Sequence, residues 1–596
     1  MTANGTIAAE RSPGQDRRIW LVRLATGLIH GLLLFALHRA GEAQVWPATV
    51  PALFGPLVLV CAYVPVVVLG GVGRLPWRAL AIWAGAAALV LAGLAWHDAV
   101  QRAPADLNSP GPYPSPALFV AAAAALFIAH HLVLPAVRAG RPVAPYALYF
   151  DTAWKAGVQL ALTVGFIGVF WILLQLGAAL FRVIGLEFLE NLIRQDWFYI
   201  PVTALVFALG VQLSDVADGL IRGVRTVGLT LLSWLAPVMT LLVAGFLLAL
   251  PFTGVQLLWD TGSATALVLG AAASLIVLVN AGYQDGTDET RPHLVLRWSA
   301  RIAALALVPL AAIAAWGLAQ RIGQHGLTPE RIYAAACALL AIVYAAGYAF
   351  AAVRPGPWMR PLELTNVVAG VGAVAVILAL FSPVADPARL SVNDQMARLA
   401  RGEVSAEQFD YAFLRFESGR HGQAALARLA ASDDAEVARR AREAQQAESR
   451  WAVAERVQAA ERRIDAWPEG ATLPDGFLDS GPRWDARSRC TADAACVAMT
   501  ADTDGDGEDE VLLAQQNGVR VFGRGEDGWR QVGDYTLPVC GRAMADAPAA
   551  MRAGRIRLVE PLRMDIEIDG RRANRAPDLD CPDPVLPPAP EAQPAP

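Results

Sequence analysis

Eleven long apolar segments occupy the first two thirds of this 596-residue chain. The hydrocarbon core of a bilayer is about 30 Å thick, and a helix needs about 20 apolar residues to cross it. Only 17% of all residues are charged, against about a quarter in soluble domains. The sequence therefore predicts a membrane all-α fold, a polytopic bundle of about eleven transmembrane helices, and excludes a large soluble enzyme, a disordered chain and a nucleic-acid binder. The predicted spans are residues 19–38, 50–72, 79–96, 116–137, 157–181, 197–213, 226–250, 263–283, 302–320, 332–353 and 364–384.

The arginines of the short loops predict the orientation of these spans. With residues 1–18 in the cytoplasm, the inner segments hold fifteen Lys and Arg residues and the outer loops hold six, as the positive-inside rule requires. An odd number of spans then places the C-terminal part outside. Lys155 is the only lysine, an arginine bias typical of a GC-rich bacterial genome. We therefore expect a multi-pass protein of the bacterial inner membrane, with a cytoplasmic N-terminus and a periplasmic C-terminus.

Composition divides the chain into a transmembrane bundle, residues 19–384, and three extramembrane parts. Residues 385–469 are charged and helix-forming, with a capping-box pattern at Ser405 and a long helix predicted from about 434 to 467. Residues 470–575 predict a small β domain, and the tail 576–596 is Pro-rich. The strand patterns are 511–513, 519–522, 555–559 and 564–568. Residues 182–196, between the fifth and sixth spans, fit either a short interfacial helix or an extension of the fifth span.

Few ionisable groups lie inside the predicted spans. His30 lies in the middle of the first span, and His130 and His131 lie toward the inner end of the fourth. Such histidines could form a polar intramembrane site for protons or cations, although a neutral histidine bonded to a neighbouring helix is the commoner arrangement. Arg23 can extend to the inner interface, and we expect Gly165 and Gly168 to allow close helix packing.

Four of the six cysteines lie in the C-terminal part: Cys490, Cys496, Cys540 and Cys581. An even number in a small outward-facing domain suits two disulfides. Three pairings are open, and the local spacing favours Cys490 with Cys496, which leaves Cys540 with Cys581. A zinc site would also use four thiols, but paired CxxC spacing is absent.

The most specific motif is the acidic run Asp-Thr-Asp-Gly-Asp-Gly-Glu-Asp-Glu at 502–510. Alternating carboxylates on a tight loop provide oxygen ligands for a hard cation, and the sequence predicts a structural calcium ion. The alternative is a solvated acidic turn. The expected ligands are Asp502, Asp504, Asp506 and Glu510 through side chains and Glu508 through its carbonyl. Because a strand rather than a helix follows, the loop resembles a single calcium loop of the integrin-type FG-GAP repeats, and nothing near it looks catalytic.

Several longer phrases resemble a known family. They are YALYFDTAWKAG at 146–157, GLTPERIYA at 326–334, DPARLSV at 386–392 and YAFLRFESGRHG at 411–422. Together they resemble the bacterial membrane-protein family called domain of unknown function 4153, over residues 15–430. The resemblance implies a multi-pass bacterial membrane protein and supplies no activity and no site residues.

Three functions fit these features. The first is a non-enzymatic envelope protein that presents a periplasmic domain for assembly, sensing or binding of a periplasmic protein partner. The second is a transporter or flippase, for which Pro237, Pro309 and the pair His130–His131 are the indications. The third is an enzyme acting on a lipid-linked substrate, although no acid–base pair, nucleophile triad or phosphate loop is present in the sequence. The expected partners are the lipid bilayer and a periplasmic protein, with no nucleic acid; the sequence does not give the oligomeric state.

Overall fold

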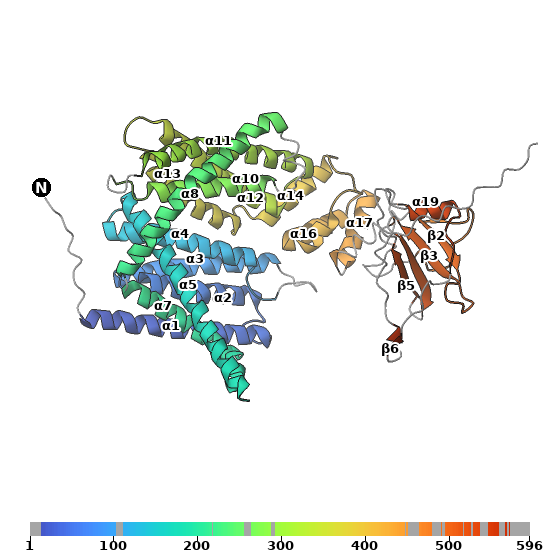
Figure 1. Cartoon of the computed structure of the whole chain (residues 1–596), viewed down its shortest axis with the longest axis horizontal. Helices are drawn as coiled ribbons and strands as arrows, with labels where there is room; N and C mark the ends of the chain where they lie inside the picture. Colours follow the sequence, from blue (N-terminus) through green and yellow to red (C-terminus); the bar gives the residue numbers. More distant parts are fainter. Residues whose placement is uncertain are drawn as a thin grey trace, which may run out of the picture. The chain divides into compact units, whose positions relative to one another are not determined.

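The computed structural model describes residues 13–102, 111–216, 218–254, 264–287, 292–447, 449–450, 464–478, 490, 495–515, 518–525, 528–536, 546–559, 567–568 and 571–572. The chain divides into two compact units, Met1–Ala441 and Arg442–Pro596. Figure 1 shows the helices of the first unit and the sheet of the second. Each unit is described by itself.

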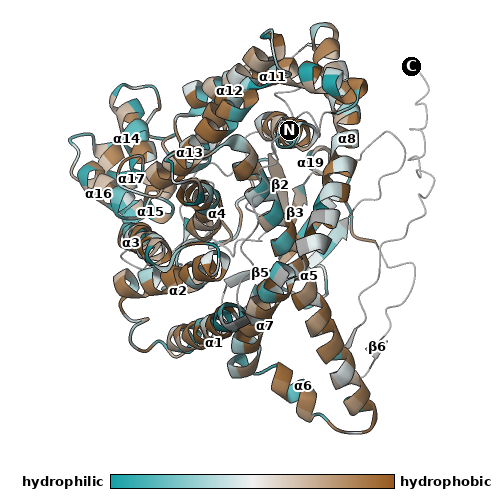
Figure 2. Ribbon diagram, turned by 90° about the vertical axis from the view of Figure 1, so that its left-hand side faces the viewer, coloured by the Kyte–Doolittle hydropathy of each residue, from teal (hydrophilic) through white to brown (hydrophobic). Residues whose placement is uncertain are grey.

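Within the described residues, eleven helices of the first unit are long and apolar enough to cross a membrane, which confirms the predicted bundle. Apolar residues cover these helices, and the long α5 carries the short α6 at its far end (Figure 2). The helices are α1 (Pro13–Glu42), α2 (Pro51–Gly71), α3 (Trp77–Arg102), α4 (Pro116–Ala139), α5 (Tyr146–Val183), α6 (Phe188–Ile193), α7 (Asp196–Val216), α8 (Asp218–Thr253), α10 (Ala264–Tyr283), α11 (Leu294–His325), α12 (Pro329–Val353) and α13 (Pro361–Leu380).

The bundle consists of two groups of helices. The first contains α1 to α5 and α7, in which α1 packs on α7 and α2 on α3. The second contains α8 and α10 to α13, and its core is rich in alanine on α11, such as Ala300, Ala303 and Ala304. Small side chains let helix backbones approach closely in a membrane, where packing rather than water drives association. Contacts of α4 with α13 and of α5 with α8 join the two groups.

The segment after the fifth span and the glycines of that span were both the subject of predictions. The segment after the fifth span forms a separate short helix, α6, because α5 ends at Val183 and Gly185 adopts a φ of +79°. The expected close packing at Gly165 and Gly168 was wrong, since nothing lies within 4 Å of a Cβ built at either position. The tight glycines are instead Gly27 and Gly31 on α1. Their built Cβ atoms would lie 2.5 Å from Ala208 Cβ and Pro201 Cα of α7.

Short helices follow the bundle. They are α14 (Pro387–Ala400), α15 (Tyr411–Phe416), α16 (Gly419–Ala430) and α17 (Ala435–Gln446), and the first unit ends within α17. The capping-box prediction at Ser405 is only partly right: its hydroxyl accepts the amide of Gln408, but α15 begins later, capped by Asp410. The helix expected to reach residue 467 also differs, because residues 464–466 form a strand and 451–463 lie outside the described residues.

The second unit is built on a five-stranded sheet in the order β1-β2-β3-β4-β5. Strand β1 pairs with β2 in parallel, and the remaining neighbours are antiparallel. The sheet confirms the strand patterns at 511–513 and 519–522, whereas residues 555–559, predicted as a strand, are irregular. The elements are β1 (Ile464–Ala466), β2 (Cys496–Ala501), β3 (Glu510–Gln515), β4 (Gly518–Gly525), β5 (Gly528–Thr536), α19 (Ala547–Arg552), β6 (Glu567–Ile568) and β7 (Arg571–Arg572).

Both faces of this sheet are covered. Phe477, Val511, Leu513 and Phe522 form a core on one face, and Leu512, Val521 and Met551 of α19 form a core on the other. Strand β3 is therefore buried along most of its length, which explains its run of apolar residues.

Candidate functional site

The end of α11 is held by a side chain from α14. Arg398 Nη1 donates to Gly323 O and Nη2 donates to Gln324 O, each at 3.0 Å. The last carbonyls of a helix have no partner within the helix, and a cation near them also complements the helix dipole. Arg398 is only 8% exposed. This arginine therefore attaches α14 to one end of the transmembrane bundle.

The turn between α11 and α12 completes this attachment. Asp394 Oδ2 accepts the amide of Leu327 at 2.7 Å, and Gln395 Nε2 donates to the carbonyls of His325 and Leu327 at 3.1 Å. Gly326 adopts a φ of +75°, and a Cβ there would lie 2.5 Å from Gln395 Nε2. Only glycine suits this turn, because the conformation is left-handed and α14 lies directly on it.

A buried histidine–carboxylate pair lies at the same end of the bundle. His97 Nε2 of α3 lies 2.8 Å from Asp386 Oδ2, and both side chains are buried. Asp386 is also the N-cap of α14, since its Oδ1 accepts the amide of Arg389 at 2.9 Å. One carboxylate thus starts α14 and holds it to α3. Nearby, burial lowers the pKa of His421 on α16.

We call residues 386–430, with the contacts just described, the cap. The cap contains two of the phrases that carry the family resemblance, DPARLSV and YAFLRFESGRHG. A third phrase, GLTPERIYA, begins in the turn between α11 and α12 that α14 contacts. Gly419 of α16 lies against the backbone of Gln101 at the end of α3. The loops that the cap contacts, after α3 and α11, belong to the arginine-poor set predicted to lie outside.

Inside the bundle, two amides and two phenols form a closed hydrogen-bond ring. Asn280 Nδ2 donates to Tyr348 Oη at 2.6 Å, Tyr348 Oη donates to Asn366 Oδ1 at 2.8 Å, and Asn366 Nδ2 donates to Tyr146 Oη at 3.0 Å. Asn366 Nδ2 also donates to Asn280 Oδ1 at 2.6 Å, and Tyr146 Oη donates to the same oxygen at 3.2 Å, which closes the ring. The ring joins α5, α10, α12 and α13. Because its members satisfy one another, it stabilises the packing of four helices rather than lining a path.

A second interior cluster holds charged groups. Arg23, which was expected to extend toward the inner interface, is 1% exposed, and its Nη2 lies 2.9 Å from Asp215 Oδ2 near the end of α7. Arg74 Nη2 lies 2.6 Å from the other oxygen, Asp215 Oδ1, and 2.8 Å from Gln159 Oε1. A buried arginine needs a carboxylate partner, so α1, the end of α2, α5 and α7 share one ion-pair cluster.

The three predicted intramembrane histidines do not come together. His30 is buried on α1, whereas His130 and His131 lie on α4 with ring centroids 5.3 Å apart. Trp83 Nε1 donates to His130 Nδ1 at 3.1 Å, and His131 Nδ1 lies 2.7 Å from the carbonyl of Phe127. Within the described residues, none of the three joins a group of His, Cys, Asp and Glu that could hold a metal. The pair therefore fits interhelical packing better than a relay.

The acidic loop lies between β2 and β3 and gathers part of the predicted ligand set. Ligand atoms of Asp502, Asp504 and Glu510 all lie within 4.8 Å of one another. Asp506 was also predicted as a side-chain ligand and is not in this group. Glu508 was predicted to bind through its backbone carbonyl, and this grouping of side chains does not test that prediction. Gly505 and Gly507 adopt φ angles of +82° and +87°. These left-handed residues fold the loop back on itself, so that an all-oxygen donor set faces one point.

Hydrogen bonds inside the loop orient these carboxylates. Asp502 accepts the amides of Gly505 at 2.6 Å and Gly507 at 3.1 Å, and Glu510 Oε2 accepts the amide of Thr503 at 2.7 Å. Glu510 is 7% exposed. The donor set of hard oxygens matches calcium chemistry, and the amide bonds equally satisfy the carboxylates of a plain acidic turn.

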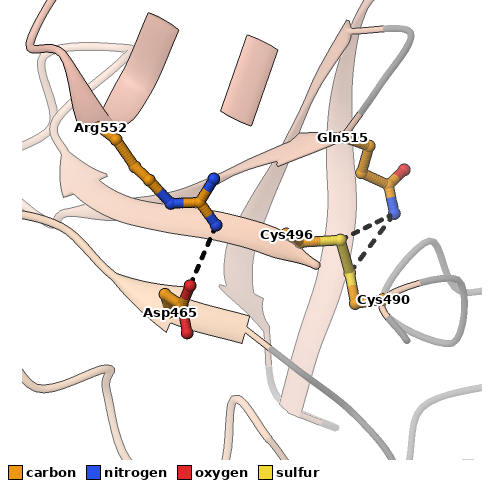
Figure 3. Close-up of a disulfide and its surroundings, with 5 residues drawn as sticks. All are labelled: Asp465, Cys490, Cys496, Gln515 and Arg552. Atoms are coloured by element: carbon orange, nitrogen blue, oxygen red, sulfur yellow. Dashed lines mark hydrogen bonds and ion pairs between the residues drawn. A yellow bond between two sulfur atoms is a disulfide. The ribbon is translucent and has the colours of Figure 1, made fainter. Parts of the chain in front are cut away.

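A disulfide joins Cys490 and Cys496, with an S–S distance of 2.02 Å. This is the local pair that the spacing favoured, and Cys540 and Cys581 lie outside the described residues. Figure 3 shows Gln515 Nε2 beside both sulfurs, and the ion pair of Arg552 with Asp465 at 3.0 Å. The bridge links Cys490 to the first residue of β2.

The pairing of His97 with Asp386 was not predicted from the sequence. Asp386 followed by Pro387 does indicate the start of a helix, because a cap residue often precedes a proline at the first helical position. The partnership with His97 has no such signal, because 289 residues separate the two. The attachment of Arg398 to α11 escaped prediction for the same reason.

Comparison with known proteins gives one result. The family described as "Domain of unknown function (DUF4153)" matches residues 14–429, which cover the bundle and the cap. No curated protein and no solved structure matches the sequence.

Proposed function

The chain belongs to the family described as domain of unknown function 4153, and on this premise we propose that it is a non-enzymatic envelope protein of the bacterial inner membrane. In this proposal the multi-pass bundle is an anchor. The cap and the C-terminal sheet are held in the periplasm, where the sheet is available for assembly, sensing or a protein partner.

The observation that carries the proposal is the attachment of the cap to the arginine-poor end of the bundle. Arg398 of α14 donates hydrogen bonds to the end of α11, and Asp386 at the start of α14 bonds His97 of α3. Such contacts fix the cap to the bundle, which favours a structural role for this end of the bundle. Since arginine-rich loops stay in the cytoplasm, this end belongs on the periplasmic side.

The bundle interior supports an anchor rather than a transporter. Two clusters of polar side chains in the interior, the ring that contains Asn280 and Asn366 and the cluster around Asp215, are held by hydrogen bonds and ion pairs among their own members. Pro237 and Pro309 lie inside the continuous helices α8 and α11 instead of separating half-helices with free ends, which is the arrangement of many transporter sites.

Acids that are candidates for an enzyme site form ion pairs. Asp151 pairs with Arg225, Glu190 pairs with Arg182 and Arg194, and Asp196 lies 3.4 Å from His38. Each of these carboxylates lies beside a basic side chain, which favours a structural role over the acid–base role of an enzyme site.

The second unit supplies two features suited to the periplasm. A disulfide persists in an oxidising compartment, and the loop at Asp502 would bind calcium as a structural ion that joins β2 to β3. We propose calcium as the ion because its ligands would all be oxygens. Neither feature points to catalysis, which agrees with a binding or sensing module.

The redox state of Cys490 and Cys496 in living cells tests the compartment. Cells are quenched in acid, free thiols are blocked, and disulfides are then reduced and labelled with a mass tag. We expect Cys490 and Cys496 to be tagged, and Cys61 and Cys337 of the bundle, which are free thiols, to remain blocked as internal controls. Reduced Cys490 and Cys496 in unstressed cells would contradict a periplasmic location.

A further inference from the structure

We propose that Arg297 and Arg301 of α11 bind the phosphate of an anionic phospholipid at one edge of the bundle. The proposal depends on the bundle lying in a membrane and not on its orientation. These two arginines have no part in the proposed envelope function, and the proposal gives them a class of ligand.

Two tryptophans show where the bilayer surfaces cross α11. Trp298 and Trp316 are 54% and 62% exposed. They are eighteen residues apart, which is five helical turns and about 27 Å, so they lie on the same face. Tryptophan is enriched at both membrane interfaces, and this spacing matches a hydrocarbon core of about 30 Å. Trp298 therefore marks one headgroup layer.

Both arginines lie at this layer. Arg297 adjoins Trp298 in sequence, and Arg301 follows one turn later on the same side of α11. The guanidinium carbon of Arg301 lies 5.6 Å from the ring centroid of Trp298, and that of Arg297 lies 5.9 Å from the ring of Trp358. Each charged group is thus held against an aromatic face instead of extending freely into water.

Neither arginine has a counter-ion within the described part of the protein. No hydrogen bond or ion pair links either side chain to a described residue, and the Nε atom of each is buried without a hydrogen-bond partner. By contrast, Arg23 and Arg74 at the other buried charge cluster share Asp215. A partly desolvated cation without a partner is costly, so an anion from the surroundings is the missing component.

The phospholipid phosphate fits this position best. Arginine presents a planar fork that matches phosphate oxygens, and basic pockets between transmembrane helices bind anionic headgroups. Two more cations, Arg354 at the end of α12 and Arg360 before α13, lie on loops at the same end of the bundle. A free phosphate ion offers the same chemistry, and the experiment separates the two sources.

The test uses the purified full-length protein in a neutral detergent. Phosphatidylglycerol, phosphatidylcholine or inorganic phosphate is titrated in, and both the thermal midpoint and lipid retention in native mass spectrometry are recorded. The test variant is R297Q/R301Q. The matched control is R78Q/R141Q, which removes two exposed arginines from the same end of the bundle. A third variant, R297K/R301K, keeps the charge and loses the fork.

We expect phosphatidylglycerol to raise the midpoint of the wild type and the control, and the other two ligands to leave it unchanged. Phosphatidylglycerol should bind R297Q/R301Q about tenfold more weakly, with R297K/R301K between the two. Should R297Q/R301Q not fold, the lysine variant decides: affinity equal to the wild type would overturn the phosphate fork. Unchanged affinity in R297Q/R301Q, an equal loss in the control, or a full effect of inorganic phosphate would also overturn the proposal.

Discussion

At the residue scale, buried carboxylates with two partners are the positions where a single change should have the largest effect. Asp386 caps α14 and binds His97, and Asp215 binds Arg23 and Arg74. Each aspartate therefore satisfies groups from two or three elements. Loss of one such carboxylate leaves its buried partners without a hydrogen-bond acceptor, which costs more than the loss of an exposed contact.

Replacement of Asp386 should loosen the cap. Asp386→Ala removes the N-cap, worth about 1 kcal/mol, and the buried bond to His97, worth about 2 kcal/mol. We expect a loss of about 3 kcal/mol in the free energy of unfolding, measured by chemical denaturation in detergent. Asp434→Ala is the matched control, because Asp434 is exposed and only accepts amides at the start of α17. Equal losses in both variants would show that His97 contributes nothing.

Replacement of Asp215 should destabilise the bundle itself. Asp215→Asn leaves Arg23 and Arg74 as buried cations without a carboxylate, and breaking a buried ion pair costs about 3–5 kcal/mol. Asp151→Asn changes the same charge in an ion pair that is 52% exposed on the acidic side, so it should cost at most about 1 kcal/mol. Folded yield and denaturation midpoint in detergent measure both. Similar midpoints for the two variants would contradict a buried role for Asp215.

At the scale of elements, the sequence predicted the existence of the spans better than their ends. The first span was expected at 19–38, and α1 runs over Pro13–Glu42. Apolar windows stop at charged residues such as Arg18 and Arg39, although a helix continues through them into the headgroup layer. The strand predicted at 555–559 is absent for a different reason. Ile556 and Leu558 alternate with arginines, but no neighbouring strand in the described sheet pairs with this segment.

The crossing of α1 and α7 gives a prediction at this scale. A Cβ on Gly31 would lie 2.5 Å from Pro201 Cα, a backbone atom that cannot rotate away. Gly31→Ala should therefore separate the helices and cost about 1–3 kcal/mol. Gly165→Ala on α5 is the control, since nothing lies within 4 Å of a Cβ built there, and it should change the free energy of unfolding by at most about 0.5 kcal/mol. A harmless Gly31→Ala would contradict the close packing of α1 and α7.

The loop between β2 and β3 gives a second prediction. Calorimetric titration of the full-length protein should detect calcium binding with a dissociation constant of about 0.1–1 mM, as in extracellular modules. The variant D502N/D504N should abolish it, because it removes two of the three gathered carboxylates. The variant D465N/D534N changes two exposed acids of the same sheet and should bind calcium normally. If the wild type shows no heat of calcium binding, the loop is a solvated acidic turn and the calcium prediction is contradicted.

At the scale of the whole molecule, helix number followed from hydropathy, and helix pairing did not. No pattern in the sequence connects Arg23 to Asp215 or Asn280 to Asn366, because each pair joins helices far apart in the chain. The cap was read as a helical segment without a position. Its place on the bundle depends on Arg398 meeting the end of α11, a long-range contact that only the folded arrangement reveals.

The central claim is that the C-terminal part lies in the periplasm. Its most direct test is labelling of intact cells with a membrane-impermeant maleimide, in a background carrying Cys61→Ala and Cys337→Ala. Tyr535→Cys reports on the sheet and Arg141→Cys on the arginine-rich end, both at exposed positions, and the background without an added cysteine is the blank. We expect labelling of Tyr535→Cys in intact cells and of Arg141→Cys only after lysis. The reverse pattern would contradict a periplasmic C-terminal part.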